Sequence, residues 1–254
     1  MFDAQQWAVP PANLTLSENQ VHVWRVFLNA SQEVRASMER VLSEEERTRA
    51  ARFYFERDRQ SWIIAHGVLR LLLARYLQLE PQKLLFVSNK YGKPALAPAH
   101  QGKLAFNLSH SRDIALYALA CGRQVGVDVE YMKDNIEYDT LAKVSFSPQE
   151  QIALRALEGE AKHAAFFSCW TRKEAYIKAR GMGLSLPLDL FDVSLRPDDA
   201  PALLASREDP REVNRWTLRN LFPGTGYAGA LAVEGSGWEL SCWQWVNFRS
   251  HRDT

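Results

Sequence analysis

The predicted secondary-structure elements of this 254-residue chain occur twice in the same order. A strand pattern at 21–27 is followed by a capping box that begins at Ser43 and ends at Glu46, and then by a long helical pattern at 58–79. Three short strand patterns follow, at 84–88, 104–108 and 114–121. The first half of the chain therefore has the order strand, helix, long helix, strands.

The second half repeats this order. A strand pattern at 125–130 precedes a second capping box, from Ser147 to Glu150, and a long helix that ends at Gly181. Further strand patterns occur at 191–195, 216–221, 227–233 and 238–245, with a polar loop at 196–214. The repetition predicts an α+β fold of two pseudo-symmetric α/β halves, residues 1–121 and 122–254, with the active site in the cleft between them.

The composition narrows the class of partner. Lysine and arginine number 31 against 30 for aspartate and glutamate, so a net charge of +1 gives no reason to expect binding to nucleic acid or to a membrane. The cysteines Cys121, Cys169 and Cys242 are far apart, as in a protein with reduced thiols. No signal peptide is visible, and the most apolar run contains His66 and Arg70. These features predict a cytoplasmic protein.

Two carboxylates lie on one face of the predicted strand at 125–130. Because side chains alternate along a strand, Asp128 and Glu130 point the same way. Such a pair repels unless a cation lies between its members, so Mg²⁺ binding is the natural functional interpretation. Glu174, on the following helix, would supply a third carboxylate. The alternative is a strand with one solvated face.

The long helix carries a second pair of ionisable groups. Glu174 and Lys178 are four residues apart and therefore share one helix face. A pair with this spacing is most often a solvated surface pair worth a few tenths of a kcal/mol. The pair alone does not indicate a functional site.

Two polar segments upstream suit a phosphate group. Tyr91, Gly92 and Lys93 belong to a basic turn whose glycine permits close backbone approach. Residues 107–111, Asn-Leu-Ser-His-Ser, close a strand with a run of hydrogen-bonding side chains. Each segment alone is more often structural, but their occurrence together with the carboxylates favours a phosphate-binding site.

Taken in order, four motifs resemble those of the 4′-phosphopantetheinyl transferases, and in particular the larger surfactin-synthetase-activating (Sfp-like) type. The motifs are residues 92–94, 106–111, 126–130 and 170–178, and the resemblance spans about residues 43–195. It implies a monomer that transfers the 4′-phosphopantetheine moiety of coenzyme A to a serine of an apo acyl or peptidyl carrier protein. Adenosine 3′,5′-bisphosphate would be released. The carrier would be acidic and would serve fatty-acid, polyketide or nonribosomal peptide biosynthesis.

The resemblance also implies roles for individual residues. It makes Asp128, Glu130 and Glu174 the ligands of Mg²⁺, for which Mn²⁺ is an alternative. Glu174 and Lys178 would be catalytic, the glutamate as general base and the lysine beside the pyrophosphate. Residues expected to contact coenzyme A are Arg49, Tyr91, Gly92, Lys93, Asn107, Ser109, His110 and Lys178.

The two halves would then have different tasks. The half at 1–121 would contact the nucleotide of coenzyme A, and the half at 122–254 would carry the metal site, the catalytic helix and the docking face for the carrier. That docking face is expected near Arg172, Arg180 and the segment 181–187.

Two other functions share part of this pattern. A metal-dependent nuclease also places an aspartate and a glutamate on a strand, but it usually has a lysine two residues beyond, where this chain has Met132. A module that binds coenzyme A without chemistry would not need three carboxylates, since these weaken anion binding unless a cation is present.

Overall fold

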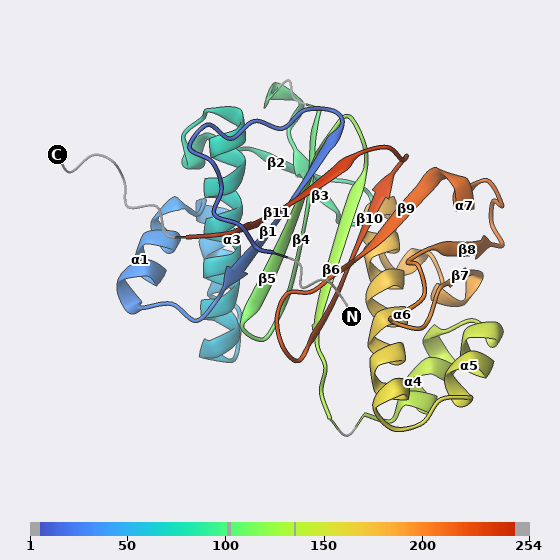
Figure 1. Cartoon of the computed structure of the whole chain (residues 1–254). Helices are drawn as coiled ribbons and strands as arrows, with labels where there is room; N and C mark the ends of the chain where they lie inside the picture. Colours follow the sequence, from blue (N-terminus) through green and yellow to red (C-terminus); the bar gives the residue numbers. More distant parts are fainter. Residues whose placement is uncertain (1–5, 101–102, 135, 247–254) are drawn as a thin grey trace.

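Four layers form the body of the computed structural model, which describes residues 6–100, 103–134 and 136–246. Two sheets pack face to face, and one long helix covers the outer face of each (Figure 1). Helix α3 (Glu56–Leu77) packs on the first sheet and helix α6 (Gly159–Arg180) on the second, and each has 22 residues. None of the described helices has the length and apolar character needed to cross a membrane.

The first sheet has the strand order β11-β1-β5-β4 and the second has the order β6-β10-β9. Neighbouring strands are antiparallel except β1 and β11, which are parallel. Their bounds are β1 Gln20–Phe27, β4 Leu104–Ser111, β5 Ile114–Cys121, β6 Val125–Tyr131, β9 Trp216–Leu221, β10 Tyr227–Glu234 and β11 Glu239–Gln244. The mixed architecture confirms the expected α+β class.

The alternation of side chains along each strand decides which layer it faces. On β5, Tyr117 and Leu119 pack toward α3, while Leu116 and Ala118 fill the core between the sheets. The valines of β6 also fill this central core. The intervening residues of β6, among them Asp128, therefore face α6.

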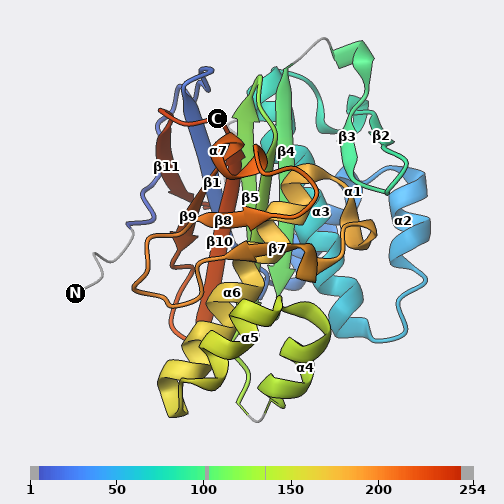
Figure 2. The ribbon, with the colours of Figure 1, turned by 90° about the vertical axis from the view of Figure 1, so that its right-hand side faces the viewer.

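Shorter elements complete each half. Helices α1 (Gln32–Val41) and α2 (Glu44–Ala50) precede α3, and α4 (Tyr138–Ser145) and α5 (Pro148–Arg155) precede α6. The remaining elements are η1 Pro81–Lys83, β2 Phe86–Ser88, β3 Pro94–Leu96, η2 Pro98–His100, η3 Gly183–Ser185, η4 Leu188–Leu190, β7 Phe191–Val193, β8 Leu203–Ser206 and α7 Glu212–Arg215. Figure 2 shows α4, α5, β7 and β8 on the side of α6 away from the sheets, so this helix is covered on two sides.

Several predicted elements have different bounds in the structure. Both capping boxes are present, and the helix predicted at 58–79 runs from 56 to 77 because Gln78 takes a left-handed conformation. The strand predicted at 104–108 continues to Ser111, and that at 84–88 begins only at Phe86. The polar loop predicted at 196–214 is wrong in part, since it contains β8. Helices α1 and α4 were not predicted.

The last strand crosses the predicted boundary between the halves. Strand β11 lies in the sheet of the first half, where Val23 is paired with Cys242. The division of the chain at residue 121 stays a prediction. It does not coincide with the division into two sheets, because β11 follows residue 121 and yet belongs to the first sheet.

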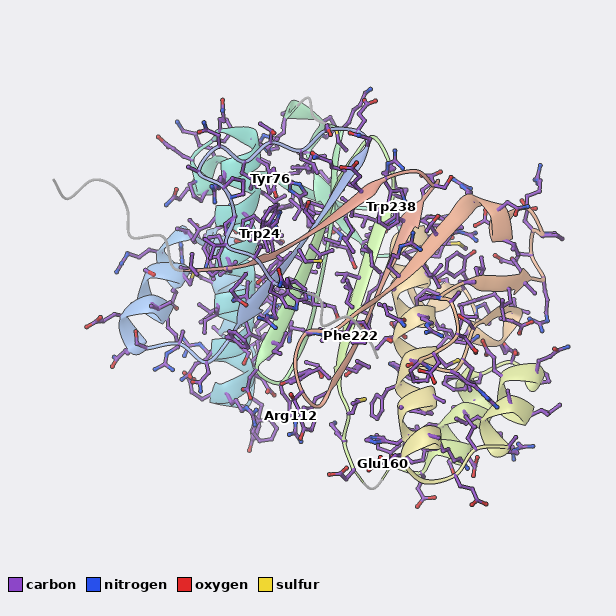
Figure 3. The ribbon with its side chains drawn as sticks, in the orientation of Figure 1. Trp24, Tyr76, Arg112, Glu160, Phe222 and Trp238 are labelled. Atoms are coloured by element: carbon purple, nitrogen blue, oxygen red, sulfur yellow. The ribbon has the colours of Figure 1, made fainter. Side chains whose placement is uncertain are left out.

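Two histidines lie in or beside the core of the first half, His22 buried and His66 half-buried. The hydroxyl group of Tyr76, on α3, is hydrogen-bonded to the ring of His22 on β1 and accepts a hydrogen bond from Trp24 on the same strand. The side chain of Tyr76 thus extends from α3 to the first sheet (Figure 3). His66 lies on α3 against Trp62. Burial lowers the pKa of each histidine to about 4. The neutral imidazole is therefore the form that the folded chain holds.

The contribution of these two histidines to the free energy of unfolding is expected to fall as the pH is lowered from about 6.5 to about 4. In this range an unfolded histidine binds a proton that the folded one does not, so acid favours the unfolded chain. Near pH 5 each histidine should account for about 2 kcal/mol. Carboxylates with raised pKa values, Glu174 among them, act in the opposite direction, so the test compares variants. Urea unfolding at pH 7 and pH 5 should show a change in stability for His66→Gln that differs from that of the unaltered chain by about 2 kcal/mol. The same change in both proteins would contradict the prediction.

Candidate active site

Three polar side chains of β4 cross from the first sheet to β6 in the second. Asn107, Ser109 and Ser111 alternate along the strand and share one face. Asn107 Oδ1 accepts a hydrogen bond from a backbone amide of β6 at 2.8 Å. Ser109 Oγ donates to Asp128 Oδ1 at 2.8 Å, and Ser111 Oγ donates to Glu130 Oε2 at 2.9 Å. The motif predicted to close a strand therefore lies within the strand and joins the two sheets.

The ammonium group of Lys178, on α6, lies against Asp128. Lys178 Nζ is 2.5 Å from Asp128 Oδ1 and donates to Ser109 Oγ at 2.9 Å. Burial acts to lower the pKa of Lys178, but the charge of Asp128 and its hydrogen bond outweigh burial and the pKa is raised. Asp128 is only 1% exposed. A protonated lysine thus pairs with a buried carboxylate where the two sheets meet.

Gly126 allows helix and strand to approach closely enough for this contact. A Cβ atom at Gly126 would lie 2.2 Å from Ala175 O and 2.3 Å from Ala179 N. Both are backbone atoms of α6, which no side-chain rotation can move aside. Because Gly126 and Asp128 share one face of β6, the close approach brings Lys178 within reach of Asp128.

The charges of Asp128 and Lys178 also affect the pKa values of the other two carboxylates, Glu174 and Glu130. Burial raises the pKa of Glu174 to about 7, the charges of Asp128 and Glu130 raise it as well, and Lys178 opposes them. Burial and the charge of Asp128 also raise the pKa of Glu130, against the hydrogen bond from Ser111. One lysine therefore does not neutralise the three carboxylates.

This shortage of positive charge fits a divalent cation. Three carboxylates and one ammonium leave two negative charges when all four groups are ionised. Asp128 Oδ2 is buried and has no hydrogen-bond partner among the described residues. No three histidine, cysteine, aspartate or glutamate side chains in the described ranges are already gathered around a metal position. The donor set suits Mg²⁺, and the metal assignment stays a prediction.

The residues expected to contact coenzyme A are not all free to do so. Asn107 and Ser109 are each 7% exposed and bond to β6 or its side chains. His110 directly follows Ser109, so its side chain points to the opposite face of β4, where it is exposed. Arg49 lies over the ring of Trp62, with the guanidinium carbon 5.8 Å from the ring centroid.

The turn at Tyr91 and Gly92 is exposed, whereas Lys93 is half-buried. Lys93 Nζ donates to Val125 O at 3.2 Å and to Ala179 O at 3.0 Å. Burial lowers the pKa of Lys93 to about 8. Its ammonium group is thus engaged with the second half of the chain.

The docking role expected for Arg172 is wrong. Arg172 is 0% exposed and donates to Ser194 O at 2.6 Å and to Asn220 Oδ1 at 3.1 Å. Its guanidinium group is enclosed by these partners, of which Ser194 directly follows β7 and Asn220 lies on β9. Arg180 is partly exposed, but it already forms an ion pair with Glu212 at 2.8 Å.

Sequence reasoning left the contact of Ser111 unassigned. The period of two that begins at Asn107 and passes through Ser109 was the available signal, because it places Ser111 on the same face. The turn residue Asn89, which reaches α6, had no such signal.

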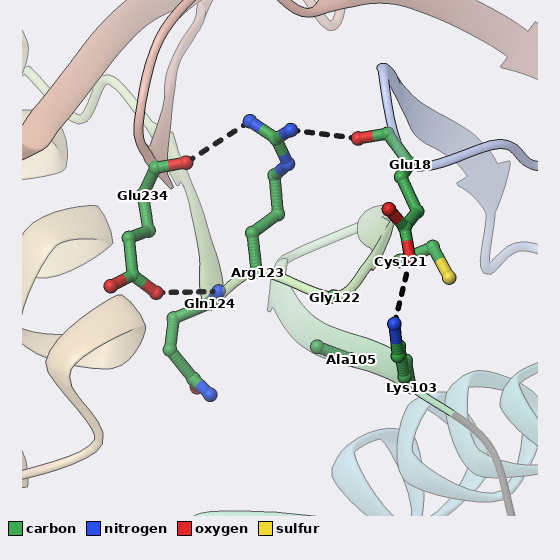
Figure 4. Close-up of a pocket in the computed structure, with 8 residues that line it drawn as sticks. All are labelled: Glu18, Lys103, Ala105, Cys121, Gly122, Arg123, Gln124 and Glu234. Atoms are coloured by element: carbon green, nitrogen blue, oxygen red, sulfur yellow. Dashed lines mark hydrogen bonds and ion pairs between the residues drawn. The ribbon is translucent and has the colours of Figure 1, made fainter.

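A polar pocket of about 430 Å³ lies at the other end of β4 and β6 (Figure 4). Its lining includes Ala105 and Gln124, at the opposite strand ends from Ser111 and Glu130. Charged groups in it are already paired, as Lys103 is with Glu18 at 2.9 Å. The pocket is therefore separate from the carboxylates.

Comparison with known families matches most of the chain. Residues 124–232 match the model of the 4′-phosphopantetheinyl transferase superfamily. Residues 29–121 match the model of the N-terminal region of 4′-phosphopantetheinyl transferases.

Individual relatives agree with these family matches. The 4′-phosphopantetheinyl transferase HetI of Nostoc sp. is 38% identical over 240 residues, which cover 94% of this chain and 98% of that protein. The 4′-phosphopantetheinyl transferase Sfp of Bacillus subtilis is 34% identical over 66% of this chain and 73% of its own. A crystal structure of a holo-(acyl-carrier-protein) synthase from Bacillus anthracis, covering 44% of this chain at 24% identity and a TM-score of 0.34, is too dissimilar to support an argument. The matching models and the full-length similarity to HetI show that this chain belongs to the 4′-phosphopantetheinyl transferase family.

Proposed function

We propose that Asp128, Glu130, Glu174 and Lys178 form the site at which this transferase acts. The enzyme transfers the 4′-phosphopantetheine moiety of coenzyme A to a serine of a carrier protein. The observation that carries the site assignment is the contact of Lys178 with buried Asp128, at the meeting of the two sheets. Buried ionisable groups with shifted pKa values are typical of catalytic sites.

The proposed metal is Mg²⁺, with Mn²⁺ as the alternative, held by Asp128, Glu130 and Glu174. When bound, such a cation supplies positive charge to the pyrophosphate of coenzyme A. The buried and unpartnered Asp128 Oδ2 supports this part of the proposal.

Glu174 is proposed as the general base. A serine hydroxyl is a weak nucleophile until its proton is removed as the attack on the β-phosphate begins. Burial raises the pKa of Glu174 to about 7. A general base works best when its pKa lies near the working pH, because it is then largely unprotonated and still basic enough to accept a proton. The protonated Lys178 would stabilise the charge that develops on the departing bisphosphate.

The remaining contacts with coenzyme A are assigned to the first half of the chain, residues 1–121. Arg49, Tyr91, Gly92 and His110 have exposed or partly engaged groups that suit a nucleotide and its phosphates. Asn107 and Ser109 would act mainly through their hydrogen bonds to β6, which join the two sheets. The half at 122–254 carries the carboxylates and the docking face, now without Arg172.

The proposal includes an acidic carrier protein, a monomeric enzyme and a cytoplasmic location. The free thiols of Cys121 and Cys169 support a reducing compartment. Gel filtration with light scattering measures the monomer directly, and a stable dimer would contradict that part.

Incubation with coenzyme A, Mg²⁺ and an apo carrier protein is expected to add one phosphopantetheinyl group per carrier, as seen by intact mass. Asp128→Asn should reduce this transfer by about a hundredfold or more, because it removes the charge that pairs with Lys178. Asp189→Asn, at an exposed position of η4, is a matched control that should retain full activity. A folded Asp128→Asn enzyme with normal turnover at low Mg²⁺ would refute the site assignment. A carrier of unchanged mass with the unaltered enzyme would refute the function.

A further inference from the structure

The turn between β2 and β3 holds the C-terminal end of α6 from the other half of the chain. Lys93 Nζ donates to Ala179 O at 3.0 Å, and Asn89 Nδ2 donates to Gly181 O at 2.7 Å. The last carbonyl groups of a helix have no partner within the helix itself. Here two of them, at the end of α6 and at its cap, receive donors that lie about ninety residues earlier in the sequence.

The turn is built to present these two donors. Asn89 Oδ1 accepts hydrogen bonds from the backbone amides of Tyr91 and Lys93, each at 2.9 Å. Gly92 closes the turn with a positive φ of 85°, which a glycine adopts without strain. The side-chain oxygen of Asn89 thus holds the turn together, while its side-chain nitrogen donates to the end of α6.

The helix end is shaped to receive the turn. Gly181 has a φ of 66°, and a Cβ atom on it would lie 2.9 Å from Lys93 Cδ and 3.1 Å from Asn89 Nδ2. The absence of a side chain at Gly181 therefore serves both the helix cap and the contact. The ammonium group also lies at the negative end of the helix dipole, where a cation is stabilising.

Lys93 contacts the strand as well as the helix. The same Nζ donates to Val125 O at 3.2 Å, and Val125 is the first residue of β6. One ammonium group therefore joins the end of α6 to the start of β6. These are the two elements that carry Lys178 and Asp128, whose side chains are 2.5 Å apart.

We infer that Lys93 and Asn89 are positioning residues for the transfer reaction. Lys93 holds Ala179 against β6, Asn89 holds Gly181 against the same turn, and these contacts fix the neighbouring Lys178 at Asp128. The inference rests on the proposed role of the Lys178–Asp128 pair. It assigns the ammonium group of Lys93 to the protein itself, and leaves only the exposed backbone of the turn to the nucleotide.

Steady-state kinetics separate this role from a direct hold on coenzyme A. A group that binds the nucleotide equally in the ground and transition states would change KM, whereas a group that orients the catalytic lysine changes kcat. Lys93→Met should lower kcat about tenfold with KM for coenzyme A changed less than about twofold, since small misplacements of a catalytic group are costly. Asn89→Ala should act in the same direction. Lys83→Met, which removes an exposed ammonium from the same half, is the matched control and should leave both constants unchanged.

A double variant tests whether Lys93 acts through Lys178. If it does, Lys93→Met should lower kcat no further in a Lys178→Met background, because the group being positioned is absent. Thermal unfolding of each variant establishes that all are folded at the assay temperature. Independent, multiplicative losses would overturn the inference, as would a raised KM with unchanged kcat in Lys93→Met. Full activity of Lys178→Met would overturn the proposed site itself, and with it any positioning role.

Discussion

Glu174→Gln is expected to lower turnover at least about a hundredfold while leaving the fold intact. Glutamine keeps the shape and hydrogen-bonding size of the side chain but removes its negative charge and its basicity. Both losses matter, because Glu174 is proposed to bind the metal and to accept the proton of the carrier serine. Groups that hold coenzyme A are unchanged, so the variant should still bind it.

The measurements are kcat with saturating carrier and coenzyme A, and binding of coenzyme A by calorimetry. Glu160→Gln is a matched control, since Glu160 is exposed at the opposite end of the same helix (Figure 3). Normal turnover in Glu174→Gln would leave the fold and family unaffected but would refute the mechanism. Loss of coenzyme A binding with unchanged kcat would assign Glu174 to substrate binding instead.

Lys173→Met is expected to destabilise the fold by about 3–5 kcal/mol, because it leaves a buried carboxylate without its partner. Lys173 Nζ is 2.7 Å from Glu150 Oε2, and the side chains are 1% and 4% exposed. The same nitrogen also donates to Leu188 O at 2.7 Å and to Phe191 O at 2.6 Å. Removing it also takes a hydrogen-bond donor from each of these carbonyl groups.

Urea unfolding at pH 7 measures the loss. Lys162→Met is the matched control on the same helix, because Lys162 pairs with the largely exposed Asp139 and such pairs contribute at most about 1 kcal/mol. The double variant Lys173→Met with Glu150→Gln should recover part of the stability, since it removes the uncompensated charge. Equal stability of Lys173→Met and Lys162→Met would show that the buried pair is not an anchor of α6.

Local signals in the sequence predicted the local parts of this fold. The capping boxes at Ser43 and Ser147 depend on residues three positions apart, and both are present. The left-handed Gly181 likewise ends α6 as predicted. Helix α1 was missed, although Ser31 caps it and Val34, Met38 and Val41 have helical spacing, so both local signals for it were available.

The site depended more on contacts between distant segments. The period of two placed Asp128 and Glu130 on one face of the strand. No local signal showed that Lys178 would contact Asp128, because that contact depends on the close approach of α6 to β6 at Gly126. The docking role predicted for Arg172 was wrong for a similar reason. Its charge suggested a surface, whereas β7 and the following segment bury it through Ser194.

The parallel pairing of β1 with β11 has a consequence for synthesis of the protein on the ribosome. Arg25 and Gln244, which bond across this pair, are 219 positions apart, so β1 emerges long before its partner exists. Until then the first sheet has an unpaired edge, which is prone to association with other chains. Closing so long a loop is also slow compared with local folding. We therefore expect that the nascent first half cannot reach its final form by itself, and that the two halves become stable together, late and as one cooperative unit.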